Sequence, residues 1–89
     1  MEITYNPVRR DINLKRYKVD LADVEDVFTD IFALTTSYRG HDRELFVTLG
    51  TDSSGQLLVV VYTYRGQSEI RVISARHAEP HERQCYEEG

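Results

Sequence analysis

The feature that most constrains this fold is a continuous apolar, β-branched run over residues 57–64, followed by a turn and a second run over residues 69–74. A run of this composition predicts a central strand that is covered on both faces. Gly66-Gln67, which separates the two runs, is typical of a tight two-residue turn. The sequence therefore predicts an antiparallel β-hairpin in which Tyr62 faces Arg71 across the ladder.

The rest of the chain predicts helices near its beginning and strands after them. Asn6-Pro7 is typical of a helix start, because asparagine caps free amides and proline fits the first turn. After Asp20, one apolar stripe predicts a second helix, and its members are Leu21, Val24, Val27, Phe28 and Ile31. The expected elements, in order, are a strand over 2–5, helices over 7–17 and 21–31, strands over 32–38, 45–49, 57–64 and 69–74, and a helix over 80–87.

These elements predict a single α+β domain over residues 1–89 with a mostly antiparallel sheet. A chain of this length can bury one modest core. We expect the order strand, helix, helix, four strands, helix, with the two N-terminal helices on one face of the sheet and a short C-terminal helix. With a two-residue turn, Ile70 and Val72 lie on the helix-covered face, whereas Arg71 lies on the other face beside Tyr62 and Tyr64.

The distribution of charge permits a local basic site in a chain that is acidic overall. The formal net charge is −4, which argues against nonspecific binding of nucleic acid, because such binding depends on basic residues that displace counterions. However, the last third of the chain carries Arg65, Arg71, Arg76 and Arg83. Arginines within apolar strands must face either internal carboxylates or a phosphate-bearing ligand.

Other classes are disfavoured by the residues present. Cys85 is the one cysteine, so we expect no internal disulfide and a reducing, cytoplasmic setting. The longest apolar run, over residues 57–61, is too short to span a bilayer, and no basic leader precedes an apolar stretch. One cysteine and three separated histidines show no metal-ligand spacing, so we expect neither a metal nor another cofactor.

Several segments, taken in order, resemble a known family. They include Tyr5-Asn6-Pro7, residues 59–66, the block Ile-Arg-Val-Ile-Ser-Ala-Arg over residues 70–76, and Glu-Arg-x-x-Tyr-Glu over residues 82–87. Together they are similar to the BrnT family of bacterial toxins. The resemblance implies a compact RelE-like fold and metal-independent ribonuclease activity. It also implies neutralisation by a small BrnA-like antitoxin, in a heterotetramer whose antitoxin carries the DNA-binding element.

Metal-free RNA cleavage needs a base for the 2′-hydroxyl, a cation for the phosphate and an acid for the leaving 5′-oxygen. Arginine supplies the cation, and histidine is the best proton carrier by its intrinsic pKa. The candidate catalytic residues are Arg71, Arg76, His77, Arg83 and Tyr86, with Glu44 and Glu82 as further possible bases. Side chains that can stack on bases or bind phosphates are Arg43, Tyr62, Tyr64 and Arg65.

Structural alternatives remain open at these positions. Arg71 and Arg76 can instead pair with Glu44, Glu69 or Glu82, and Tyr86 can simply pack the last helix onto the sheet. A second function is also open, in which the chain is a catalytically weakened toxin-fold module that binds the antitoxin and acts in transcriptional autoregulation. The acidic net charge favours this reading, as does Arg16-Tyr17-Lys18 in place of the family's Lys-His-Gly.

Overall fold

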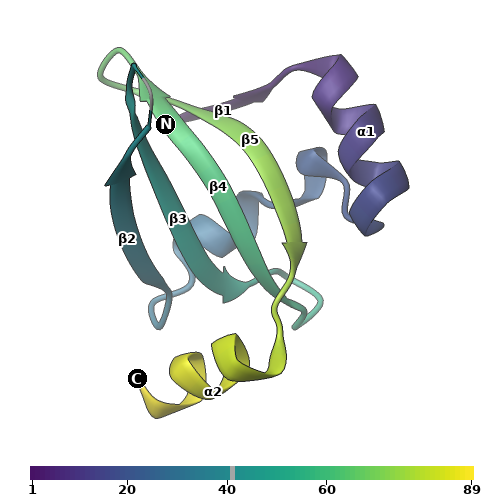
Figure 1. Cartoon of the computed structure of the whole chain (residues 1–89), viewed down its shortest axis with the longest axis vertical. Helices are drawn as coiled ribbons and strands as arrows, with labels where there is room; N and C mark the ends of the chain where they lie inside the picture. Colours follow the sequence, from purple (N-terminus) through teal and green to yellow (C-terminus); the bar gives the residue numbers. More distant parts are fainter. Residues whose placement is uncertain (41) are drawn as a thin grey trace.

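The computed structural model describes residues 1–40 and 42–89, so His41 lies outside the described residues. The elements are β1 (Glu2–Tyr5), α1 (Pro7–Tyr17), the 3-10 helices η1 (Leu21–Asp23) and η2 (Glu25–Thr29), β2 (Leu34–Arg39), β3 (Glu44–Thr51), β4 (Leu57–Arg65), β5 (Glu69–His77) and α2 (Pro80–Glu88). The strands form one sheet in the order β1-β5-β4-β3-β2 (Figure 1). Only the β1–β5 pair is parallel, which confirms the predicted α+β class and mostly antiparallel sheet.

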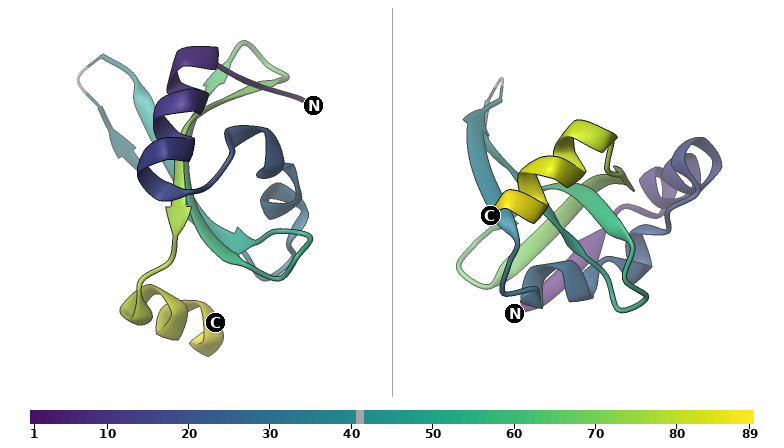
Figure 2. Two further views of the ribbon diagram at one scale, coloured as in Figure 1. Left: turned by 90° about the vertical axis from the view of Figure 1, so that its right-hand side faces the viewer. Right: turned by 90° about the horizontal axis from the view of Figure 1, so that it is seen from below.

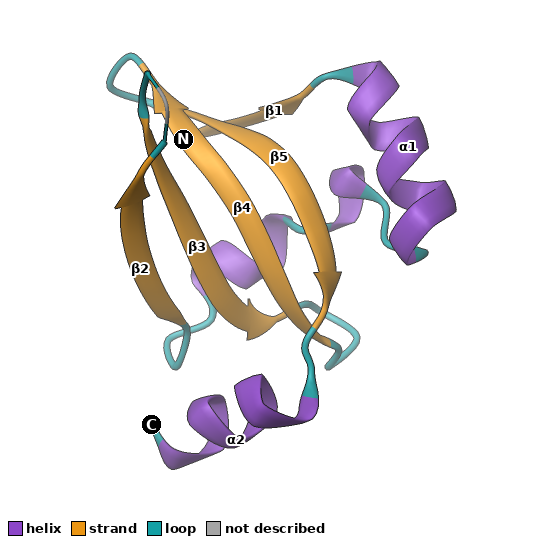
Figure 3. Cartoon of the chain, in the orientation of Figure 1, coloured by secondary structure: helices purple, strands orange, loops and turns teal. Residues whose placement is uncertain are grey.

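The predicted second α-helix over residues 21–31 is wrong, because two short 3-10 helices stand in its place (Figure 3). Leu21, Val24 and Val27 recur every three residues and are all buried. A period of three is that of a 3-10 helix, so this spacing keeps the three side chains on one face. Asp20 caps η1 by accepting the amide of Ala22, whereas Ile31, expected on the buried stripe, is 87% exposed.

The core lies between the sheet and these two 3-10 helices. We call this side of the sheet the inner face and the opposite side the outer face. The buried apolar cluster on the inner face contains Val19, Leu21, Val24, Val27, Leu58, Val60, Tyr62, Ile70, Val72 and Ala75. Figure 2 shows η1 and η2 on this side and α1 along the β5 edge, so the prediction that both N-terminal helices cover one face is wrong for α1. No described helix is long and apolar enough to cross a membrane.

The predicted register of the β4–β5 hairpin is also wrong. Arg65 pairs with Glu69, so the loop has three residues, and Gly66 in it has a φ of 68° that favours glycine. Tyr62 therefore pairs with Val72 on the inner face, and Arg71 pairs with Thr63 on the outer face. A shift of one residue exchanges the two faces of a strand, which is why Tyr62 and Arg71 lie on opposite sides.

A β-bulge follows this segment and changes the course of β5. Tyr62 pairs with Val72 and Val61 pairs with Ser74, so Ile73 has no residue opposite it on β4. A bulge adds one residue to one strand and bends it locally. The pairing of β1 with β5 ends at the same place, at Val72. The later part of β5 therefore has a free edge, and this edge faces α1.

Asn13 of α1 occupies that free edge. Its side-chain nitrogen donates to the carbonyl oxygens of Val19 and Ala75, both at 2.8 Å, and its side-chain oxygen accepts the amide of Ala75 at 3.1 Å. The residue is 4% exposed and is the buried residue of α1. The Asn13 amide thus replaces a neighbouring strand for Ala75, and it ties the end of α1 to both β5 and the segment that leads into η1.

Replacement of Asn13 by alanine should strongly destabilise the fold. The change leaves three buried backbone groups without their partner, and each such loss costs about 1–3 kcal/mol. We expect the free energy of unfolding, measured by urea denaturation, to fall by about 3 kcal/mol or more. Asp11→Ala, an exposed change on the same helix, serves as the control, and a loss at Asn13 no larger than this control would contradict the role given to the amide.

Candidate active site

A groove runs between α1 and β5. Three adjoining cavities form it, and each shares lining residues with the next. The middle cavity, of about 170 Å³, shares Arg9 and Ile73 with one end and Arg16 and Tyr17 with the other. We call the whole feature the α1–β5 groove, with an arginine end and a histidine end. Arg71 and Arg76 mark the two ends. They pair with Thr63 and Val59, four residues apart on β4, which corresponds to about 13 Å.

The arginine end is a cavity of about 310 Å³ whose lining includes four arginines. Arg9 comes from α1, Arg43 precedes β3, Arg65 ends β4 and Arg71 lies in β5. Within residues 1–40 and 42–89, none of these four arginines forms an ion pair, and the remaining lining residues Asn6, Val72 and Ile73 carry no charge. Four charges of one sign around one cavity favour an anion.

The start of α1 lies at the same end of the groove. Asn6 caps this helix, because its side-chain oxygen accepts the amides of Val8 at 2.8 Å and Arg9 at 3.4 Å. The positive end of the helix dipole therefore adds to the potential from the arginines. Glu69, the carboxylate nearest to Arg65 and Arg71 along the chain, accepts a hydrogen bond from the hydroxyl of Thr4 instead.

The histidine end is a cavity of about 400 Å³ lined by Arg16, Tyr17, Arg76, His77 and Glu79. It brings cations and proton-carrying side chains together, which the arginine end does not. The guanidinium of Arg16 lies over the Tyr17 ring, 5.3 Å from its centre. This end therefore offers both phosphate-binding and proton-transfer groups to a ligand in the groove.

Arg76 at this end is held by Glu82 of α2. Its two terminal nitrogens donate to the two carboxylate oxygens, each at 2.8 Å, and one also donates to the carbonyl oxygen of His77 at 3.2 Å. The hydrogen bonds from Arg76 lower the pKa of Glu82 to about 2 and raise the pKa of Arg76. The structural alternative of an internal ion pair is thus confirmed for Arg76 with Glu82.

Tyr86 anchors α2 to Asp30, the residue that caps the end of η2. Its hydroxyl donates to the carboxylate of Asp30 at 2.6 Å, and the same carboxylate oxygen accepts from the amide and hydroxyl of Thr51. Partial burial raises the pKa of Asp30, but these hydrogen bonds and one from the Phe32 amide outweigh it and lower the pKa to about 2. The bond to Asp30 raises the pKa of Tyr86, so its hydroxyl stays protonated at neutral pH.

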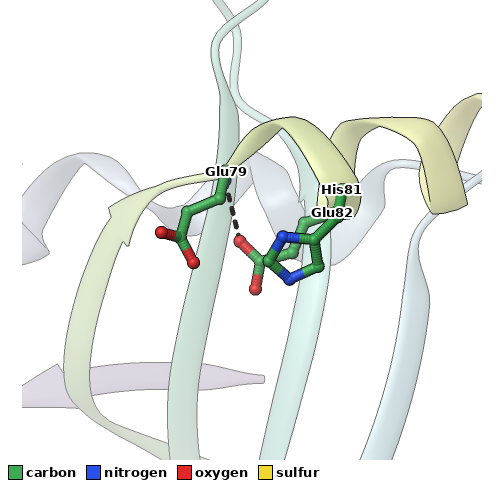
Figure 4. Close-up of side chains that lie close together, drawn as sticks. All are labelled: Glu79, His81 and Glu82. Atoms are coloured by element: carbon green, nitrogen blue, oxygen red, sulfur yellow. Dashed lines mark hydrogen bonds between the residues drawn. The ribbon is translucent and has the colours of Figure 1, made fainter.

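Glu79, His81 and Glu82 gather at the start of α2, as Figure 4 shows. Their ligand atoms lie within 4.8 Å of one another. The cap of the helix accounts for this grouping, because the carboxylate of Glu82 accepts the amide of Glu79 at 2.8 Å. Glu82 is also bound by Arg76, so its carboxylate is occupied by two donors rather than held ready for a metal ion.

The remaining predicted site residues lie outside the groove. Tyr62 is 4% exposed and its hydroxyl is hydrogen-bonded to Thr48 at 2.8 Å, so in this structure its ring is not open to a base. Tyr64 is 45% exposed at the margin of the inner face, with its ring 4.9 Å from that of Phe46. Arg83 is exposed on α2. Of the predicted residues, the groove brings together Arg43, Arg65, Arg71, Arg76 and His77.

Sequence reasoning missed two arginines of the groove, Arg9 and Arg16. Both come from the same helix face as Ile12 and Asn13, which also line the middle cavity. Positions separated by three, four and seven residues share one face of an α-helix, so the helical spacing of these four residues was the signal that could have found them.

The fold and groove define a small α+β protein with a basic, open site and an anchored C-terminal helix. Residues 5–82 match the family model described as "Ribonuclease toxin, BrnT, of type II toxin-antitoxin system". The chain therefore belongs to the BrnT family of ribonuclease toxins. The crystal structure of the Brucella abortus ribonuclease toxin BrnT is similar, with a TM-score of 0.71 at 20% identity over 89% of this chain and 97% of that chain. Curated protein sequences give no significant match.

Acid should release α2 before it unfolds the sheet. Asp30 and Glu82 both have a pKa lowered to about 2 from ordinary values of 3.8 and 4.5, so each stabilises the folded state above its ordinary pKa. That stabilisation is lost as the pH falls from about 4.5 towards 2. We expect the NMR signals of residues 80–88 to shift over this range, as a measure of helix release.

Asp23→Asn, a change of an exposed acid in η1, is the control and should leave this transition in place. Asp30→Asn should weaken α2 docking already at neutral pH, because a neutral amide accepts the Tyr86 hydroxyl more weakly than a carboxylate does. Signals of residues 80–88 that stay constant down to pH 2 would contradict the account of how α2 is anchored.

Proposed function

We propose that this chain is an endoribonuclease that cleaves RNA in the α1–β5 groove by attack of a 2′-hydroxyl on the adjacent phosphorus, without a metal ion. The observation that carries the proposal is the continuous groove itself. One end has arginines that form no ion pair with any described residue, and the other has an arginine beside a histidine. Membership of a family of ribonuclease toxins supports the same reaction class. The RelE-like label stays a prediction.

The histidine end is where we place the reaction. His77 takes the proton of the 2′-hydroxyl or returns one to the leaving 5′-oxygen, and Glu79 is the second proton carrier in the same cavity. The 2′-oxygen forms a bond to phosphorus as the bond to the 5′-oxygen breaks, which leaves a 2′,3′-cyclic phosphate. Arg76 and Arg16 stabilise the charge that develops on the phosphoryl oxygens.

The other predicted catalytic residues take different parts in this proposal. Tyr86 acts at a distance, because its bond to Asp30 positions α2 and hence the Glu82 carboxylate that orients Arg76. Arg71 binds the RNA backbone at the arginine end together with Arg43 and Arg65. Arg83 is exposed on α2 and Tyr64 is exposed near the inner face, where each can contact RNA that leaves the groove.

A partner antitoxin follows from the family, since a type II toxin is paired with a protein antitoxin. We propose a small BrnA-like antitoxin that covers the outer face and the groove, in a heterotetramer that contacts DNA only through the antitoxin. The outer face supports this placement, because its apolar residues Val47, Leu49 and Val61 are only half-buried. We place the pair in the cytoplasm, where RNA is accessible.

A second function is favoured by two observations. Arg76 is already neutralised by Glu82, and a chain with a net charge of −4 attracts RNA weakly at long range. Both features fit a catalytically weakened module that binds the antitoxin and acts in transcriptional autoregulation. The two functions differ in whether expression of this chain alone degrades RNA and stops growth, because the weakened module does neither.

Arg76→Ala should lower the rate of RNA cleavage on the order of a hundredfold, which is the effect of removing one donor to a developing oxyanion. Purified protein is incubated with RNA in EDTA, and the 2′,3′-cyclic phosphate product is quantified. Glu82→Gln is the matched control, because it breaks the same ion pair and loosens α2 but keeps the guanidinium. We expect Glu82→Gln to lower the rate by less than about tenfold.

Equal losses in Arg76→Ala and Glu82→Gln would mean that Arg76 acts only through the docking of α2, and the assignment of a catalytic arginine would be wrong. An absence of cleavage by the unmodified chain, on all RNAs tested and with a bound antitoxin removed, would overturn the nuclease proposal in favour of the binding module.

A further inference from the structure

We infer that the arginine end of the groove is a separate subsite for an RNA phosphate that lies away from the bond being cut. The inference rests on the proposed function for the location of the reaction, but the binding that it describes is measurable without any cleavage. It assigns a ligand class to four arginines that the reaction at the histidine end does not use, namely Arg9, Arg43, Arg65 and Arg71.

The positive charge at the arginine end is not neutralised by any described carboxylate. Arginine is always protonated, so the four guanidinium groups carry four positive charges around one cavity. In the part of the chain that the structure describes, ion pairs join Arg10 with Asp20 and Arg76 with Glu82, and neither involves these four. Guanidinium groups bind phosphate oxygens in pairs of hydrogen bonds, so the cavity is suited to a phosphoryl group.

The described lining of the arginine end lacks a proton-transfer group. Its described lining consists of the four arginines, Asn6, Val72 and Ile73, and none of these transfers a proton near neutral pH. The site can therefore bind a phosphate, but it has no base to activate a 2′-hydroxyl there. His77 and Glu79 lie at the opposite end of the groove.

The two ends of the groove are too far apart to share one phosphate. Arg71 and Arg76 pair with Thr63 and Val59, which are four residues apart on β4 and hence about 13 Å apart, so one phosphate does not reach both ends. The middle cavity connects them. It shares Arg9, Arg16, Tyr17 and Ile73 with the two ends, and the lining residues that belong to it alone, Ile12, Asn13 and Ser74, carry no charge. A strand that lies in the groove thus presents one phosphate to the histidine end and a different one to the arginine end.

The phosphate can come from two positions in an RNA. An internal phosphodiester carries one negative charge, and a terminal phosphomonoester carries about 1.5 to 2 at neutral pH, which matches four arginines better. Both present the same phosphoryl oxygens to guanidinium groups. The experiment therefore uses an oligonucleotide of eight nucleotides in three forms, with a 5′-phosphate, with a 3′-phosphate and with neither.

Binding is measured first, by fluorescence anisotropy with a 2′-O-methyl oligonucleotide that cannot be cleaved. Arg43→Ala and Arg65→Ala should each weaken binding about tenfold. Each should also reduce the slope of log K against log salt by about 0.7, the value for one phosphate contact on a single strand. Lys15→Ala, which removes an exposed cation of α1 outside the groove lining, is the matched control and should change neither quantity.

Cleavage is measured next, with a dinucleoside monophosphate and with the eight-nucleotide RNA. In the arginine variants KM for the long RNA should rise about tenfold with little change in kcat, whereas the dinucleotide should react as it does with the unmodified chain. A binding preference for one terminal phosphate identifies that end as the source, and equal binding of the three forms identifies an internal phosphodiester.

Two results would overturn the subsite. Binding and salt dependence in Arg43→Ala and Arg65→Ala that equal those of Lys15→Ala would show that no phosphate occupies the arginine end. Equal losses on the dinucleotide and the long RNA would make these arginines part of the reacting centre. If the unmodified chain binds the oligonucleotide through these arginines but cleaves no RNA, the nuclease proposal fails and the subsite stands.

Discussion

The bond between Asn13 and the free edge of β5 is the interaction on which the rest of the site depends. β1 stops pairing at Val72, and a bulge at Ile73 turns the later part of β5 away, so the backbone of Ala75 needs another partner. A side-chain amide supplies both a donor and an acceptor and so replaces a strand. This attachment holds α1 beside β5, and the groove exists because the two elements are fixed side by side.

The two ends of the groove differ in whether a carboxylate of the protein neutralises their arginines. At one end the protein neutralises an arginine with its own carboxylate, and the pair between Arg76 and Glu82 also ties α2 to the sheet. At the other end four arginines line one cavity with no carboxylate among the described lining residues. Charge repulsion of this kind destabilises a fold, and it is typical of surfaces that a polyanion neutralises. The proposed RNA binding by an acidic chain therefore rests on one local basic surface.

The elements were predictable where the signal is local. The β-branched run over residues 57–64 and the Asn6-Pro7 cap give their strand and helix correctly, because backbone preference and capping act over a few residues. The hairpin register was not predictable, because a three-residue loop and a bulge both depend on packing. The sequence predicted the site in part, because Arg71 and Arg65 do line one cavity. Arg9 joins them only through the attachment of α1 to β5, which the sequence did not reveal. Arg76 lies at the other end of the groove.

The most direct test of the central claim is an NMR titration of the arginine side-chain Nε–H signals with an uncleavable RNA oligonucleotide. The account predicts that the signals of Arg9, Arg43, Arg65 and Arg71 shift together and saturate at one RNA concentration, while Arg10, paired with Asp20, does not respond. Shifts confined to arginines outside the α1–β5 groove, or no shift at saturating RNA, would contradict it.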